Sequence, residues 1–146
     1  MADRNPAAER DRQGELELSA DLEAAAGRWI AHLGAERGLA AATIEAYRRD
    51  LAQLVAFLAA RLGHVPSLGD LAALDVRAIR AFLSARRKAG IDSRSLARSL
   101  SALRTFYRWL DADEGISNRA VQRVAMPKLA RRVPRPLTID RALSLV

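Results

Sequence analysis

Apolar residues recur every three or four positions along most of this chain, which is the spacing of helices that bury one side. No segment alternates apolar and polar residues for long enough to form a strand. The pattern predicts an all-α protein, a compact bundle of four to five helices whose sequential neighbours pack roughly antiparallel. Helices are expected at about residues 19–38, 41–62, 75–88, 93–111 and 118–125, with one short helical turn after Ser67.

Each predicted helix carries a stripe of apolar residues that we expect to form the core. The stripes consist of Leu22, Trp29, Ile30 and Leu33; Ile44, Tyr47, Leu51, Leu54, Leu58 and Leu62; Ile79, Phe82 and Leu83; Leu96, Leu100, Leu103, Tyr107 and Leu110; and Val121 and Val124. The chain's two tyrosines share helical positions with leucines in these stripes. We therefore expect both tyrosines to pack in the core rather than to act as nucleophiles.

The predicted helix at residues 93–111 carries a second row of residues with the same spacing, two positions out of phase with its leucines. At about 100° per residue, this row lies opposite the apolar stripe. The row consists of Arg94, Arg98, Ser101, Thr105 and Arg108, with Arg104 beside it. It contains no acid, whereas an ordinary solvated helix face mixes signs. Such a face suits a row of phosphates with room for base edges; the competing interpretation is that the arginines only keep the helix soluble.

The net charge of +7 is unevenly distributed along the chain. Residues 1–26 carry a net charge of −4, whereas residues 86–108 and residues 119–141 each carry seven Lys or Arg against one Asp, a net +6. Segregation of this kind favours a polyanion as partner. Nucleic acid is preferred to a membrane, because the bulky apolar residues are committed to a core and the apolar runs are too short to span a bilayer.

No metal, cofactor or catalytic residue is expected in this chain. It has no cysteine, which excludes disulfides, thiolate nucleophiles and cysteine-ligated zinc and is compatible with a reducing cytoplasm. His32 and His64 lie far apart, without the spacing of zinc ligands. The glycines are scattered helix stops rather than a phosphate-binding loop.

The pattern divides the chain into four parts. Residues 1–18 are charged and lack periodicity, which predicts a mobile acidic tail, and residues 19–126 form the helical domain. Residues 127–137 hold three prolines and several cations, which predicts a basic linker with an extended reach of roughly 35 Å. Residues 138–146 begin another amphipathic pattern, expected to be the start of a truncated second domain; a short helix docked on the same bundle is the competing interpretation.

Three segments of the chain resemble one known family. ERGLAAATIEAYRRDLAQLVAFL (residues 36–58), SRSLARSLSALRTFYRWLDADEG (93–115) and MPKLARRVPRPLT (126–138) are similar to the N-terminal core-binding, or SAM-like, domain of Xer-type tyrosine recombinases. The XerC branch is the closer likeness. The resemblance implies a DNA-binding bundle, joined by the linker to a catalytic domain that carries the nucleophilic tyrosine beyond residue 146. The two domains of such a protein clamp the duplex from opposite sides.

The resemblance also implies partners and a site. The partners are a double-stranded DNA recombination site and, for the complete protein, a second Xer-type recombinase in a tetrameric synapse that resolves chromosome dimers in the cytoplasm at cell division. The predicted helices at residues 41–62 and 93–111 would share the DNA-binding surface. The candidate DNA-binding residues are Thr43, Arg48, Arg49, Arg94, Arg98, Ser101, Arg104, Thr105, Arg108, Lys128, Arg131 and Arg132. The linker cations among them would contact phosphates without reading sequence.

Single residues carry further expectations. Asp50 is expected to pair with a neighbouring arginine rather than to read a base. Alanine in place of Arg94, Arg98 or Arg104 is expected to cost little stability, as for any exposed helix position. The chain has Ala40 where the family usually has a serine, so the helix that follows lacks a hydroxyl cap unless Thr43 or water substitutes.

Two other classes of function remain open from the sequence. A stand-alone helical DNA- or RNA-binding regulator would have a complete C-terminus rather than a helix cut at Val146. A structural interaction bundle would have an affinity for DNA that hardly changes with salt. The chain alone is expected to be monomeric and unable to cut DNA.

Overall fold

The computed structural model describes residues 18–125, which fold into helices without a strand. The all-α prediction is therefore confirmed for this part of the chain. The helices are α2 (Ala20–Ala35), α3 (Ala41–Leu62), α4 (Leu68–Ala72), α5 (Val76–Lys88), α6 (Ser93–Glu114) and α7 (Ala120–Arg123). The predicted tail up to residue 17, the linker at 127–137 and the predicted second domain at 138–146 lie outside the described residues. So do the candidate residues Lys128, Arg131 and Arg132.

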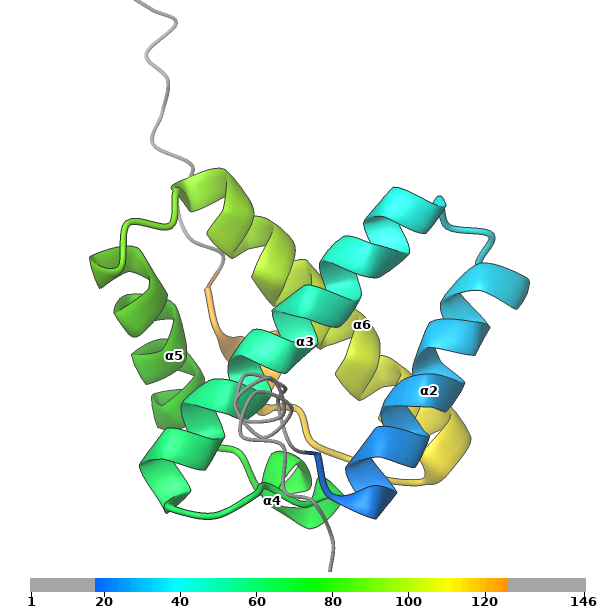
Figure 1. Ribbon diagram of the computed structural model, residues 1–146, viewed down its shortest axis with the longest axis horizontal. Helices are drawn as coiled ribbons and strands as arrows, with labels where there is room; N and C mark the ends of the chain where they lie inside the picture. Colours follow the sequence, from blue (N-terminus) through cyan, green and yellow to red (C-terminus); the bar gives the residue numbers. More distant parts are fainter. Residues whose placement is uncertain (1–17, 126–146) are drawn as a thin grey trace, which may run out of the picture.

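The two longest helices, α3 and α6, cross in the middle of the molecule (Figure 1). Helix α2 runs beside α3 in the opposite direction, and α5 lies at the other flank (Figure 1). Helix α6 packs against α3, α5 and α7, and it is therefore the central element. The predicted leucine stripe of α6 is buried, as are residues that the stripe did not include: Ser99, Ala102, Phe106 and Trp109.

An aromatic cluster joins α2, α3 and α6. The indole of Trp29 is fully buried and meets the ring of Phe106 edge-on, with 5.1 Å between ring centroids. Tyr47 is half-buried and stacks on Trp29 at 6.4 Å. The hydroxyl of Tyr107 donates a hydrogen bond of 2.7 Å to the carbonyl oxygen of Leu71, and burial raises the pKa of this phenol. The expected core packing of both tyrosines is confirmed.

Most helix ends follow the local signals in the sequence. The carboxylates of Asp75 and Asp92 accept hydrogen bonds from backbone N–H groups three residues on, and Ser67 and Asp70 form a reciprocal capping box. Gly63 ends α3 with φ 76°, a left-handed conformation that glycine adopts without strain. Helix α6 extends to Glu114, three residues further than expected.

Two expectations about burial were wrong. Leu62 was expected in the core, but it lies in the last turn of α3 and is 42% exposed. Leu18 was assigned to the mobile tail, but it is half-buried and packs against the core. Periodicity shows which face of a helix turns inward; it does not show how far the neighbouring helices extend along that face. Within residues 18–125, no helix is both long and apolar enough to cross a membrane.

Candidate nucleic-acid interface

The polar row of α6 lies on the open side of the helix, opposite its buried residues. Its members Arg94, Arg98 and Arg108 are exposed, while Ser101, Arg104 and Thr105 are half-buried. The two-faced geometry predicted for this helix is confirmed. We call these six residues the α6 row. They differ in what they contact inside the protein, and this difference decides which of them can meet a ligand.

Arg98 is held by a buried acid. Its Nε and Nη2 atoms donate hydrogen bonds of 3.0 Å to the two carboxylate oxygens of Asp50, which is 1% exposed. The hydroxyl of Ser99 donates a third hydrogen bond, of 2.8 Å, to the same carboxylate. The hydrogen bonds from Arg98 to Asp50 raise the pKa of this guanidinium. The expectation that Asp50 pairs with an arginine is confirmed, but the partner comes from a different helix, 48 positions further along the chain.

Arg104 contacts the short helix α7. Its Nη2 atom donates a hydrogen bond of 2.6 Å to the carbonyl oxygen of Val124, and its Nε atom lies 3.4 Å from that of Val121. Gln122 donates to the carbonyl oxygen of Arg104 at 3.3 Å and accepts from Arg108 at 3.4 Å. These side chains therefore satisfy carbonyl groups at the end of α7 and hold α7 on α6.

The structure contradicts one expectation for two of these arginines. Replacement of Arg98 would leave the carboxylate of Asp50 buried without its counter-charge, and replacement of Arg104 would leave carbonyl groups of α7 without a donor. We therefore expect both changes to cost stability, because an unpaired buried polar group loses its hydration without compensation. The side chain of Arg94 makes no hydrogen bond or ion pair within residues 18–125. The expectation that its replacement costs little stability therefore remains a prediction.

The N-terminal end of the α6 row is bordered by an acid. Asp92 caps α6, and its pKa lies below the usual value because the backbone N–H and side chain of Ser95 bind the carboxylate and because Arg94 and Arg98 are near. At the middle of the row, the hydroxyl of Thr105 donates to the carbonyl oxygen of Ser101 at 2.9 Å. Three cations of the row are thus exposed, of which Arg108 donates to Gln122 and Arg98 is paired with Asp50, while the side chain of Arg94 has no such partner within residues 18–125.

The three candidates on α3 differ in direction: Arg48 and Arg49 both lie near the carboxylate of Glu45, whereas Thr43 faces another side of the helix. Thr43 and Asp50 are seven residues apart and so face the same side of α3, toward α6. Arg48 is turned by about 200° from Asp50. It lines a hollow between α2 and α3 with Leu22 and Ile30, and its Nε atom donates to Glu45 at 3.0 Å.

Arg49 is exposed, and its Nε atom lies 3.9 Å from a carboxylate oxygen of Glu45. The structure thus places Thr43 on the same side of α3 as Asp50 and leaves Arg49 exposed. It places Arg48 on the other flank of α3.

Two cations that the candidate set omitted lie near the C-terminal end of the row. Arg119 lines a hollow together with Arg108, and Arg123 ends α7. Both are exposed. Their only signal in the sequence was membership of the basic block at residues 119–141, because their position beside α6 depends on how α7 docks.

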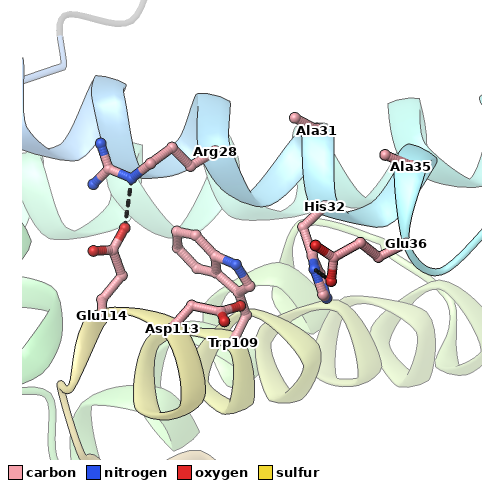
Figure 2. A pocket seen from close by; sticks show the side chains of 8 residues that line it. All are labelled: Arg28, Ala31, His32, Ala35, Glu36, Trp109, Asp113 and Glu114. Atoms are coloured by element: carbon pink, nitrogen blue, oxygen red, sulfur yellow. Dashed lines mark hydrogen bonds and ion pairs between the residues drawn. The ribbon is translucent and has the colours of Figure 1, made fainter.

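A separate hollow between α2 and the C-terminal end of α6 is lined by more acidic side chains than arginines (Figure 2). Figure 2 shows Arg28 turned toward Glu114, with 2.6 Å between Nε and the carboxylate, and the ring of Trp109 between the two helices. His32 lies 3.0 Å from Glu36. Acids outnumber arginines here, so this hollow does not suit phosphate. No group of three His, Cys, Asp or Glu within residues 18–125 is placed to hold a metal ion.

The family follows from comparison with known proteins. The sequence model described as "Phage integrase, N-terminal SAM-like domain" matches residues 26–114, which extend from α2 to the end of α6 and include both crossing helices. The chain belongs to this family of N-terminal SAM-like domains.

The names of individual relatives indicate a narrower class of protein than the family model does. The chain is 46% identical to "Tyrosine recombinase XerC" of Methylobacterium nodulans over 125 residues, 86% of this chain and 38% of that protein. It is 42% identical to the protein of the same name from Rhodospirillum centenum over 82% of this chain and 34% of that protein, and 41% identical to that of Rhizobium meliloti over 82% and 37%. The chain thus spans less than two fifths of the length of these relatives. The resemblance to Xer-type recombinases is confirmed. No solved structure matches the chain.

Proposed function

We propose that this chain is the DNA-binding domain of a site-specific tyrosine recombinase of the Xer type. The observation that carries the proposal is the α6 row, a set of cations at helical spacing on the open side of the central helix. The names of the relatives support this class over a stand-alone helical regulator.

The geometry of the row suits a duplex. From Arg94 to Arg108 the row extends over about 21 Å of helix, at 1.5 Å per residue. An α-helix fits the major groove, and arginines along its sides reach the phosphates that line the groove. Ser101 and Thr105 stand between the arginines, where a hydroxyl reaches a base edge or a phosphate. Thr43 and Arg49 of α3 extend the same surface, and Arg48 contributes from the other flank of that helix.

The remaining parts of the proposal concern the complete protein. Lys128, Arg131 and Arg132 of the linker would contact phosphates between the DNA-binding domain at residues 19–126 and a catalytic domain. The complete protein would cut and rejoin DNA in the cytoplasm, within a tetramer that includes a second Xer-type recombinase. We expect this chain alone to be monomeric.

The chain alone is not expected to cleave DNA. The hydroxyl of Tyr107 is buried and donates to the carbonyl oxygen of Leu71, and Tyr47 is packed against Trp29. A nucleophilic tyrosine must instead reach a phosphate and be surrounded by groups that stabilise the transferring phosphoryl.

The salt dependence of DNA binding tests the proposal. Fluorescence anisotropy with a labelled duplex of mixed sequence would be measured over a series of salt concentrations, for the parent, Arg94→Ala and Arg28→Ala. Each phosphate contact contributes about 0.9 to the slope of log K against log salt, so Arg94→Ala should flatten the slope by about that amount. Arg28→Ala removes the same charge from the acidic hollow of Figure 2 and should leave the slope unchanged.

Equal effects of the two substitutions would mean that only net charge matters and that the α6 row is not the interface. A parent chain with no salt-dependent affinity for the duplex would contradict the proposed function itself.

A further inference from the structure

The acid at the crossing of α3 and α6 is unusual in its burial. Among residues 18–125, the buried polar residues are Asp50 and Ser99, and they contact each other. A buried carboxylate is costly unless its oxygens are paired and hydrogen-bonded. Here one oxygen accepts from Arg98 and Ser99, and the other accepts from Arg98. The protein therefore keeps a charge in its interior and satisfies it from α6.

Arg98 uses only one edge of its guanidinium in this pair. Its guanidinium presents one edge, Nε and Nη2, to Asp50, and its side chain is 45% exposed. A guanidinium has N–H donors on its other edge as well, and those of Arg98 make no hydrogen bond within residues 18–125. Arg98 follows Arg94 by one helical turn on the open side of α6. Its free donors thus belong to the surface that the α6 row forms.

We propose that Asp50 is a positioning residue for DNA binding, which holds the guanidinium of Arg98 so that its free N–H edge meets a phosphate. This inference rests on the proposed function and deepens it. A free arginine side chain loses rotamer freedom when it binds, and that loss weakens binding. In this protein the fold has already ordered Arg98 through a two-point contact, which a planar guanidinium makes and an ammonium group does not.

Asp50 has a second consequence for the same surface. Its hydrogen bonds join the middle of α3 to the first turns of α6. The pair therefore helps to set how the two helices cross, and with it the spacing between Thr43 and the α6 row.

Long-range electrostatics alone predicts that loss of the Asp50 charge tightens DNA binding, whereas positioning of Arg98 by Asp50 predicts that the same change weakens it. The direction of the change in affinity therefore distinguishes the two. Removal of a negative charge from a DNA-binding surface tightens binding through the long-range field. If Asp50 positions Arg98, Asp50→Asn should weaken binding even though the chain becomes more positive, because a neutral amide no longer holds the arginine by two charge-assisted hydrogen bonds.

The experiment compares Asp50→Asn with Asp113→Asn, which removes the same charge from an exposed site at the far end of α6. Affinity for a labelled duplex of mixed sequence would be measured by anisotropy, at a temperature where melting curves show every variant folded. We expect Asp50→Asn to weaken binding about fivefold to tenfold at low salt. Asp113→Asn should leave binding unchanged or tighten it by about twofold at most.

Two further variants separate positioning from a general effect on the fold. In an Arg98→Ala background, Asp50→Asn should no longer weaken binding, because no arginine remains to be positioned; it should also recover part of the lost stability. Arg98→Lys keeps the charge, but an ammonium group cannot make the two-point contact of a guanidinium with Asp50. It should therefore weaken binding nearly as much as Arg98→Ala.

Tighter or unchanged binding by Asp50→Asn would overturn the inference, as would parent-like affinity of Arg98→Lys. A loss of binding that persists when Asp50→Asn is added to Arg98→Ala would assign the effect to the fold instead. All three outcomes require a parent chain that binds DNA with a salt-dependent affinity, so failure of the proposed function would be recognised separately.

Discussion

At the scale of the residue, the arginines of α6 divide by what they contact. Arg94 points to solvent, Arg98 holds a buried acid while exposing one edge, and Arg104 reaches the carbonyl groups of α7. The same residue type on one helix face thus has three different environments. A change of any one of them to alanine removes the same charge, but the free energy of unfolding should respond differently in each case.

Arg104→Ala is expected to lower the free energy of unfolding by about 1–3 kcal/mol, the cost of leaving the carbonyl group of the buried Val124 without its donor. Arg94→Ala is the matched control and should change stability by no more than about 0.5 kcal/mol. Urea unfolding followed by circular dichroism measures both. If Arg104→Ala unfolds at the same urea concentration as the parent, its contacts with α7 carry no stability.

At the scale of the element, the helices differ in how their first turns are satisfied. Side chains cap α4, α5 and α6, whereas α3 follows Ala40, which supplies no side-chain cap. Thr43 does not substitute for the missing hydroxyl. The backbone of Ala40 already has the extended conformation of a capping residue, with φ −62° and ψ 147°. Helix α3 therefore starts without a side-chain cap, although the backbone of Ala40 has the conformation in which a serine side chain could supply one.

Ala40→Ser should stabilise the protein by about 0.5–1 kcal/mol, because the added hydroxyl can accept a hydrogen bond from the backbone N–H of Thr43. Ala41→Ser, one position into the helix, is the control and should give no gain. Thermal melting compares them with the parent. Equal melting temperatures for Ala40→Ser and the parent would indicate that water already satisfies this helix start as well as a serine would.

At the scale of the whole molecule, carboxylates with lowered pKa values are spread over the fold. The pKa of Asp21 is lowered by the hydroxyl of Ser19, that of Asp70 by the backbone N–H of Ser67, and that of Asp92 by the backbone N–H of Ser95. The pKa of Glu45 is lowered by Arg48. Each carboxylate therefore binds protons more weakly in the folded chain than in the unfolded one.

Stability is expected to change little between about pH 7 and pH 5 and to fall as the pH drops below about 4. The stabilisation from these groups is present above their unfolded pKa values, 3.8 for Asp and 4.5 for Glu, and is lost as the pH falls through the lower folded values. Melting temperatures over a pH series measure this. Asp70→Asn should show a smaller loss on acidification than the parent; a melting temperature that rises below pH 4 would contradict the assignment.

The helices themselves could be predicted from the sequence, because their signals are local. The limits of α3 and α5 follow from apolar spacing and from the residues at their ends, such as Asp75 and Gly63. The opposition of leucines and cations on α6 follows from the 3.6-residue period, which is a property of one helix and needs no partner. The resemblance to the family also followed from the sequence, from the residues of the three segments 36–58, 93–115 and 126–138.

Only the tertiary structure decided which groups each arginine contacts. Asp50 and Arg98 meet across 48 positions, and Arg104 reaches α7 only because α7 docks beside it. Arg48 lies in the hollow between α2 and α3 because α2 packs beside α3 there. A helical period states which side of a helix a residue occupies, but not which element covers that side. The physical reason is that burial, pairing and exposure of a charge depend on groups distant in sequence, and these come together only when the helices pack.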